Sequence, residues 1–281
     1  QRHIHKASVR DRILHHAVFS VLNPIFESTF ISSSFSCRIG YGTHKGVQAL
    51  QRMLLSVSKN GKKPCFALKC DIKKFFDSVD QRILLSILEK RIKDENALWL
   101  LKSIVGSYNA AQLERERERG LRLARGIPIG NLTSQLFANV YLNQLDQFVK
   151  HGLGIKYYAR YTDDFVIVAN SKVDLENLLP EIRRFLSEKL MLELHPKKIL
   201  IRSFYQGIDF LGYIVFPKFR LLRTKTRQRI FKKMRGRLRQ YQAEAITKQT
   251  FEQSLQSYLG VLSHANAHNL GEKLKNLAWL G

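Results

Sequence analysis

Three aspartates stand where apolar, strand-like stretches end or turn, and their placement constrains the fold more than any other feature. Asp71 follows the apolar run 65–70, and Asp163 with Asp164 divides a β-prone hairpin pattern over 156–169. An Asp-Asp pair alone is most often an ordinary turn. Together with a second strand-end acid, the pair predicts three carboxylates at one edge of a sheet.

Three adjacent carboxylates repel one another unless cations neutralise them. Carboxylate oxygens suit Mg²⁺, and two such ions about 3.5–4 Å apart can activate a hydroxyl and stabilise a leaving phosphate oxygen. We therefore expect two Mg²⁺ ions, for which Mn²⁺ can substitute, and metal-assisted phosphoryl transfer.

The charge of the chain predicts a nucleic-acid partner. Its 281 residues include 47 Lys and Arg against 23 Asp and Glu, a formal net charge of +24. Such an excess favours binding to a polyanion. A membrane partner is disfavoured because the basic residues are spread along the chain rather than gathered on one amphipathic helix. A hydrophobic content of 44% disfavours a basic disordered tail.

Cysteine usage and hydropathy bear on the compartment. The three cysteines show no C-x-x-C spacing, which disfavours a disulfide scaffold or a cysteine zinc site and fits a reducing cytoplasm. No run of about 18 uncharged apolar residues occurs, and the chain begins at Gln1, so we expect neither a membrane span nor a signal peptide.

Helical spacing predicts a first helix over 13–21 that stops at Pro24. The charged stretch 114–119 is typical of a solvated loop or hairpin.

Residues 218–239 hold eleven basic residues and no acid. A solvated helix face would carry interspersed Glu, so we interpret this stretch as a surface that follows a nucleic-acid backbone. Its expected contacts are Arg227, Arg229, Lys232, Lys233, Arg235, Arg237 and Arg239.

Seven segments resemble, in order and spacing, the motifs of reverse transcriptases. Residues 71–77 (DIKKFFD), 126–135 (GIPIGNLTSQ) and 161–164 (YTDD) look like the first three palm motifs. The remaining four are 9–12 (VRDR) and 37–44 (CRIGYGTH), similar to fingers motifs, 192–198 (LELHPKK), similar to a lysine-bearing motif, and 210–213 (FLGY), similar to the primer-grip hairpin. The resemblance covers nearly the whole chain.

This resemblance implies an α+β right-hand polymerase fold with fingers, a palm built on an antiparallel sheet with helices, and a helical thumb. The expected domains are 1–68 (N-terminal fingers), 69–222 (palm, with a fingers insertion at about 82–126) and 223–281 (thumb). The implied activity is that of an RNA-directed DNA polymerase, a nucleotidyltransferase in which a primer 3′-hydroxyl attacks the α-phosphate of a dNTP.

The resemblance also implies residue roles. Metal ligation falls on Asp71, Asp163 and Asp164, assisted by the Ile72 carbonyl. Lys198 matches a lysine that assists protonation of the leaving pyrophosphate, and a solvated strand-end lysine is the alternative. These three aspartates and Lys198 form the expected catalytic set.

Phe76 matches the position beneath the sugar of the incoming nucleotide, where a ring would collide with a 2′-hydroxyl and select deoxynucleotides. The alternative is a core role, but Phe75 precedes it on what we take as an alternating strand, so only one ring should be core. Other expected nucleotide or template contacts are Ile129, Gly130, Gln135, Arg10, Arg12 and Arg38. The expected primer grip is Phe210, Leu211, Gly212 and Tyr213.

The second palm segment indicates a subtype. Ile129 stands where group II intron and retron enzymes usually carry Gln, and the segment ends in Ser134-Gln135 rather than Ser-Pro. This variant resembles the reverse transcriptases of diversity-generating retroelements, which copy a template-repeat RNA into cDNA with errors opposite adenines. Because isoleucine cannot hydrogen-bond near the incoming sugar, we hypothesise that Ile129 lowers discrimination. Packing beneath the palm is its alternative role.

The implied partners are template RNA, primer and cDNA as an RNA/DNA duplex, dNTP, and a small basic accessory variability protein. A group II intron-like or retron-like reverse transcriptase is one alternative. An RNA-dependent RNA polymerase is disfavoured by Phe76, and a catalytically silent RNA-binding protein on the same fold is disfavoured by the intact acids.

Overall fold

The structure, a computed structural model, describes residues 7–107 and 125–279. The α-helices are α1 (Val9–Glu27), α2 (Thr43–Val57), α3 (Phe75–Ser78), α4 (Gln81–Glu89), α5 (Glu95–Gly106), α7 (Leu132–Gln147), α8 (Lys172–Leu190), α9 (Thr224–Gln242), α10 (Lys248–Ser263) and α11 (His268–Trp279). The π-helix η1 (Phe148–Gly152) continues α7, and η2 (Pro196–Lys198) and η3 (Phe204–Gln206) are short 3₁₀ turns. The charged stretch 114–119 lies outside the described residues.

Two antiparallel sheets follow the sequence alternation. The larger has the order β2-β3-β1-β4, built from β1 (Phe66–Asp71), β2 (Tyr158–Tyr161), β3 (Asp164–Ala169) and β4 (Leu200–Ser203). The smaller has the order β5-β6-β7, with β5 (Ile208–Phe210), β6 (Tyr213–Val215) and β7 (Arg220–Leu222). The predicted strand over 65–70 and the predicted hairpin over 156–169 are therefore confirmed.

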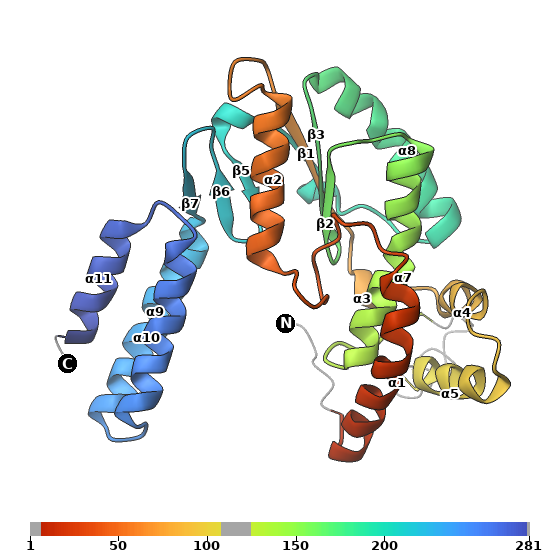
Figure 1. Cartoon of the computed structure of the whole chain (residues 1–281), viewed down its shortest axis with the longest axis horizontal. Helices are drawn as coiled ribbons and strands as arrows, with labels where there is room; N and C mark the ends of the chain where they lie inside the picture. The colour runs from red at the N-terminus through yellow and green to blue at the C-terminus, as the bar shows by residue number, and fades with distance from the viewer. Residues whose placement is uncertain (1–6, 108–124, 280–281) are drawn as a thin grey trace.

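Alternation along β1 divides the core into two layers. Leu68, Cys70 and Ile72 join one buried cluster with α1, α4, α5, α7 and α8. Ala67 points the other way, into a second cluster with α2 and the smaller sheet. Helix α2 thus covers one face of the larger sheet and α7 with α8 the other (Figure 1). Asp71 has the parity of Ala67, so it belongs to the α2 face at the end of the strand.

Helix α7 is the central support of the fold. Twelve of its sixteen residues are buried, including the polar side chains of Asn139 and Asp146. A helix buried on nearly every side has little amphipathic character, because it packs between neighbours rather than against one. Its neighbours include α1, α4, α8 and, through its C-terminal end, η1.

Helix α1 is longer than predicted. It runs from Val9 to Glu27 and contains Pro24 in its interior, although the sequence pattern predicted an end there. Proline removes one backbone hydrogen bond and crowds the preceding turn. Leu22 and Phe26 are buried on either side of Pro24, so packing of this face outweighs the local preference.

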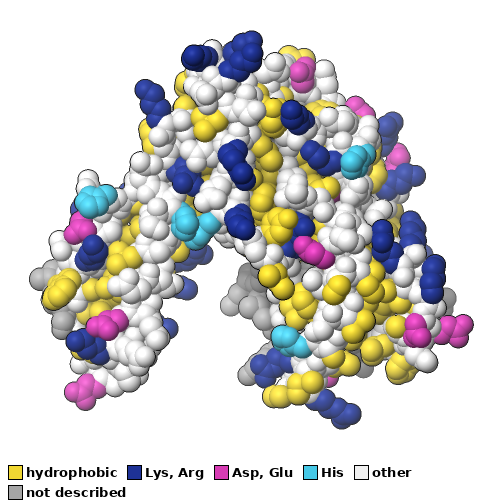
Figure 2. All heavy atoms as spheres, viewed as in Figure 1, with side chains coloured by type: hydrophobic (Ala, Val, Ile, Leu, Met, Phe, Trp, Pro, Cys, Tyr) yellow, Lys and Arg dark blue, Asp and Glu magenta, His cyan; other side chains and the backbone are white. Residues whose placement is uncertain are grey.

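Helices α9, α10 and α11 form a separate limb beside the smaller sheet (Figure 1). Ile230, Met234, Phe251, Leu262 and Leu274 are buried where they pack together. Figure 2 shows a wide hollow on this face between the limb and the rest of the molecule. Among the described residues, no helix combines the length and apolar character needed to cross a membrane.

Candidate active site

A cavity of about 370 Å³ lies at the end of the larger sheet. It is lined by residues from β1, the β2–β3 turn, the start of α7 and the β5–β6 turn. The sequence-predicted residues that the structure brings to it are Asp71, Phe76, Ile129, Gly130, Gln135, Asp163, Asp164 and Leu211.

Strand pairing places the acids together. Asp71 and Asp164 are register partners on β1 and β3, and the amide N–H of Ile72 donates to the Asp163 carbonyl oxygen at 3.1 Å. Thr162, at the apex of the β2–β3 turn, has a φ of 53°. The left-handed conformation of Thr162 lets a very short turn present Asp163 and Asp164 at the strand end.

Two lysines balance the negative charge. The ammonium group of Lys198 lies 2.8 and 2.9 Å from the two carboxylate oxygens of Asp71, and Lys69 Nζ lies 3.3 Å from Asp164 Oδ2. Burial raises the pKa of Asp164 to about 6; Lys69 opposes this shift, and the charges of Asp71 and Asp163 add to it. The cavity therefore holds a carboxylate whose charged form is destabilised in the folded protein.

The donor set fits a hard divalent cation. Asp164 Oδ1 is buried and has no hydrogen-bond partner, although a buried carboxylate oxygen is normally satisfied. All three acids line the same cavity, and carboxylate oxygens are the ligands that Mg²⁺ prefers. In the part of the chain that the structure describes, no group of three or more His, Cys, Asp or Glu side chains is arranged so that it could hold a metal ion. The two lysines instead contact Asp71 and Asp164.

The two adjacent phenylalanines have different environments. Phe75 is 1% exposed and belongs to the core, whereas Phe76 is partly buried and lines the cavity. The expectation that only one ring is core is confirmed. Its reason was wrong, since both residues lie in the short helix α3 and not on an alternating strand.

A buried arginine supports the turn that carries the acids. Arg160 is fully buried, and its Nε and Nη2 donate to Asp146 of α7 at 2.7 and 2.6 Å. Its Nη1 donates to the Thr162 carbonyl oxygen at 3.0 Å, which connects the β2–β3 turn to α7. Burial alone would lower the pKa of Arg160, but the charge and hydrogen bonds of Asp146 outweigh it and raise the pKa.

The same turn is held from a second side. The hydroxyl groups of Thr162 and Ser36 lie 2.7 Å apart, and Asn139 Nδ2 donates to the Ser36 carbonyl oxygen at 2.8 Å. Our sequence analysis did not single out Arg160, Asp146, Ser36 or Asn139. The one visible signal was an arginine inside an otherwise apolar strand pattern, which indicates a buried charge that needs a partner.

Arg38 does not reach the cavity, and its guanidinium is used within the fold. The side chain is 5% exposed, Nε lies 2.8 Å from Glu27, and Nη1 donates to the carbonyl oxygens of Ile31 and Ser34 at 2.7 Å. It also lies 4.0 Å above the Tyr41 ring. These contacts fix the segment that leads to Ser36.

The other predicted arginines lie on α1. Arg12 lines a smaller cavity of about 230 Å³ that shares Gly130, Asn131 and Gln135 with the main cavity. Arg10 is exposed on the same helix. Both therefore lie on the side of the site from which α1 approaches the start of α7.

The predicted primer-grip residues form the β5–β6 turn. Phe210 is buried, and Leu211 and Gly212 form the turn with φ of 51° and 89°. The Tyr213 hydroxyl donates to the Val261 carbonyl oxygen at 3.0 Å and lies 3.1 Å from His44 Nε2. The turn is thus anchored to α10 and α2, while Leu211 points into the cavity.

The predicted nucleic-acid contacts lie together on α9, which carries no acidic residue. Six are exposed and Arg237 is partly buried. The exposed members are Arg227, Arg229, Lys232, Lys233, Arg235 and Arg239.

Comparison with known proteins gives a family match. The family model described as "Reverse transcriptase (RNA-dependent DNA polymerase)" matches residues 1–215. The YkfC protein of Escherichia coli (strain K12) is 26% identical over 253 residues, which cover 78% of this chain and 63% of that protein. The group II intron-encoded protein LtrA of Lactococcus lactis subsp. cremoris is 25% identical over 265 residues, 72% of this chain and 42% of that protein. The chain thus spans less than two thirds of the length of these relatives.

Solved structures of telomerase share the fold. The Candida tropicalis enzyme in complex with a fragment of telomeric RNA has a TM-score of 0.53 at 13% identity, covering 96% of this chain and 45% of that chain. The Candida albicans enzyme has a TM-score of 0.52 at 12% identity, covering 94% and 53%. At this identity the likeness concerns the fold alone, which is the α+β right-hand polymerase fold expected from the sequence.

Replacing Asp164 with Asn should stabilise the protein in metal-free buffer. Because the folded-state pKa of Asp164 lies above its unfolded value, ionisation opposes folding; the cost is absent well below about pH 4 and complete above about pH 7. We expect Asp164→Asn to raise the free energy of unfolding by about 1–2 kcal/mol at pH 7.5, less than the full shift because Lys69 loses its partner. Urea denaturation across this pH range measures the difference.

The matched control is Asp174→Asn. Asp174 is an exposed carboxylate in the first turn of α8, where its negative charge interacts favourably with the helix dipole. The Asp174→Asn substitution should lower the free energy of unfolding by at most about 0.5 kcal/mol. A variant at Asp164 that is equally or less stable than the wild type at every pH would contradict the electrostatic account.

Proposed function

The chain belongs to the reverse transcriptase family, and on that premise we propose that it is an RNA-directed DNA polymerase that copies an RNA template into cDNA. The observation that carries the proposal is the meeting of Asp71 of β1 with Asp163 and Asp164 of the β2–β3 hairpin, in one cavity with Phe76 and Gln135. Members of the family generally use divalent metal ions, and the buried, unpartnered oxygen of Asp164 supports such a site here.

We assign metal ligation to Asp71, Asp163 and Asp164, with help from the Ile72 carbonyl. When bound, Mg²⁺ or Mn²⁺ would neutralise charge on the attacking 3′-hydroxyl and on the leaving phosphate. Arg160 and Ser36 hold the turn that presents two of the carboxylates, so the acids are positioned before substrate arrives. Lys198, already at the carboxylate end of the cavity, is the proposed proton donor to pyrophosphate.

The proposed substrate choice rests on Phe76. Its ring lines the cavity beside Asp71, whereas Phe75 fills the core, so Phe76 is the one available to exclude a 2′-hydroxyl. Ile129, Gly130 and Gln135 line the same cavity and are assigned to the incoming nucleotide. This arrangement favours dNTP over NTP and separates the proposal from an RNA-dependent RNA polymerase.

The larger elements fit the same proposal. We assign residues 1–68 to fingers, 69–222 to the palm with a fingers insertion at about 82–126, and 223–281 to the thumb. The separate limb of α9–α11 and the exposed cations of α9 support a thumb that follows the RNA/DNA duplex of template, primer and cDNA. Arg10 and Arg12 are assigned to triphosphate or template, whereas the internal contacts of Arg38 favour a structural role.

For the subtype, we propose a diversity-generating retroelement enzyme that copies a template-repeat RNA with errors opposite adenine, in mutagenic retrohoming, alongside a small basic accessory variability protein. Ile129, apolar and facing the cavity, supports this assignment. The three free cysteines fit a reducing cytoplasm. A group II intron-like enzyme is the second candidate, favoured by the likeness to LtrA and to the putative COX1/OXI3 intron 2 protein of Saccharomyces cerevisiae, 23% identical over 262 residues.

Primer extension on an RNA template with Mg²⁺ tests the activity. We expect the wild type to extend with dNTPs in preference to NTPs, and Asp71→Asn to lose at least about 100-fold in rate, because a ligand and its charge are removed. Asp174→Asn, which changes an exposed acid on α8, should retain the wild-type rate. Extension by Asp71→Asn at the wild-type rate, or a wild type that stays inactive with native RNA and accessory protein, would contradict the proposal.

Replacing Ile129 with Gln tests the subtype. A restored hydrogen bond near the sugar is worth about 1 kcal/mol, so errors opposite template adenine should fall roughly 3- to 10-fold. Ile129→Leu keeps the apolar character and should leave the error rate unchanged. Sequencing of cDNA made on an adenine-rich template measures both variants. A wild type that is accurate opposite adenine would instead favour the group II intron-like candidate.

A further inference from the structure

A second, larger cleft of about 720 Å³ lies between α1, α4 and α7. Its α7 wall includes Val140, Asn143 and Gln144, whereas the α7 residues of the candidate active site include Gln135. Gln144 and Gln135 are nine residues apart, which is about 180° around an α-helix. The cleft therefore lies on the opposite side of α7 from the catalytic carboxylates, and the activity proposed above does not use it.

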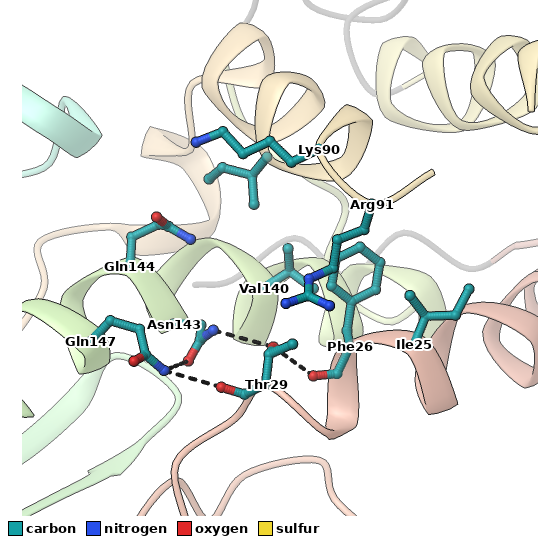
Figure 3. Close-up of a pocket in the computed structure, with 10 residues that line it drawn as sticks. Ile25, Phe26, Thr29, Lys90, Arg91, Val140, Asn143, Gln144 and Gln147 are labelled. Carbon is teal, nitrogen blue, oxygen red and sulfur yellow. Dashed lines mark hydrogen bonds between the residues drawn. The ribbon is translucent and has the colours of Figure 1, made fainter. Parts of the chain in front are cut away.

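One wall of the cleft carries side-chain amides held in fixed orientations. Gln147 Nε2 donates to the Thr29 carbonyl oxygen at 3.1 Å and to Asn143 Oδ1 at 3.2 Å, and Asn143 Nδ2 donates to Thr29 Oγ1 at 3.3 Å (Figure 3). Gln144 lies beside them, and its side-chain amide has no hydrogen-bond partner among the described residues. Its donor and acceptor are thus available to a ligand.

The opposite wall carries positive charge. Lys90 and Arg91 are exposed at the C-terminal end of α4, and Figure 3 shows the Arg91 guanidinium reaching over the cleft. Within the described ranges neither side chain has an ion-pair partner, and the adjacent Glu89 pairs with Lys102 at 3.1 Å. The two cations are thus free to receive an anion.

The remaining lining is apolar, contributed by Ile25, Phe26, Ile87 and Val140. Cations suit phosphates, amides match the paired donors and acceptors on base edges, and an apolar surface accepts a base face. An acidic peptide would use the cations but would leave the amide wall without its matching groups. The combination of all three favours a nucleotide unit over a carboxylate-rich ligand.

We propose that this cleft is an anchoring site for single-stranded RNA, outside the catalytic cavity. Phosphates would lie against Lys90 and Arg91, and a base would meet Gln144. The inference rests on the proposed function, since an enzyme that copies RNA must hold the template beyond the few nucleotides in its active site. A site on the far side of α7 would hold RNA without blocking the primer terminus.

The test measures binding of a fluorescent, unstructured oligoribonucleotide by anisotropy at several salt concentrations. Lys90→Gln/Arg91→Gln should weaken binding roughly tenfold and flatten the slope of log affinity against log salt by about 1.4, which is 0.7 for each of two phosphate contacts. Gln144→Ala removes no charge, so it should weaken binding about 3- to 10-fold with the slope unchanged.

The matched control is Lys62→Gln/Lys63→Gln, two exposed cations between α2 and β1. It should change affinity less than about twofold, because loss of distant charge alone has little effect once salt screens it. Cleft variants that match this control, or a Gln144→Ala variant that binds like the wild type, would overturn the proposal. The proposal would also be overturned if another compound displaced the labelled oligoribonucleotide as effectively as unlabelled RNA does. Such displacement by adenosine monophosphate would indicate a mononucleotide site, and by polyglutamate a site for an acidic protein.

Primer extension separates this inference from the proposed activity. On a short primer–template duplex that ends near the active site, the cleft variants should extend at the wild-type rate. If the wild type itself fails to extend, with native RNA and accessory protein as well as on the short duplex, the proposed function fails, while the anisotropy series still reports on the cleft. A cleft variant that binds RNA normally but loses extension would contradict the anchoring role.

Discussion

Asp71 and Asp164 are register partners on neighbouring antiparallel strands, so two like charges lie side by side at one end of the sheet. Directly opposed like charges destabilise a sheet, and Asp163 adds a third. Lys198 and Lys69 offset part of this repulsion, yet the pKa of Asp164 remains raised to about 6 and one of its oxygens remains unpartnered. This arrangement of carboxylates lowers the stability of the fold unless a cation neutralises them. Such a loss of stability is expected at a site that is selected for function.

A strained acidic turn needs rigid support, and the surrounding fold supplies it. The fully buried Arg160–Asp146 pair joins the turn to α7, and the Ser36–Thr162 contact joins it to the segment that Arg38 fixes. Any movement that separates a buried ion pair leaves an uncompensated charge in the interior. The pair therefore holds the elements that carry it in one arrangement. The same helix, α7, separates the acidic cavity from the cleft that we assign to RNA, so it is the shared wall of both sites.

The elements that follow local periodicity could be predicted from sequence, and the contacts that decide the site could not. The apolar, β-prone runs of the sequence predicted β1 and the β2–β3 hairpin, and the three acids lie at the ends of these strands. Pro24 led us to predict that α1 ends there, but the helix continues beyond it. Burial of Phe26 stabilises the extra turn, and this tertiary packing outweighs the local preference of proline. Arg160 finds Asp146 fourteen residues away and Arg38 finds Glu27 eleven residues away across folded elements, which no spacing rule anticipates. The cleft beside α4 likewise depends on three helices from separate parts of the chain.

The central claim is that Asp71, Asp163 and Asp164 form one divalent-cation site. Electron paramagnetic resonance of Mn²⁺ bound to the protein with primer–template and dNTP tests it most directly, with Asp163→Asn compared against the wild type and Asp174→Asn as the exposed control. The account predicts saturable binding to the wild type and to Asp174→Asn, and at least tenfold weaker binding to Asp163→Asn. Equal binding to all three proteins would contradict it.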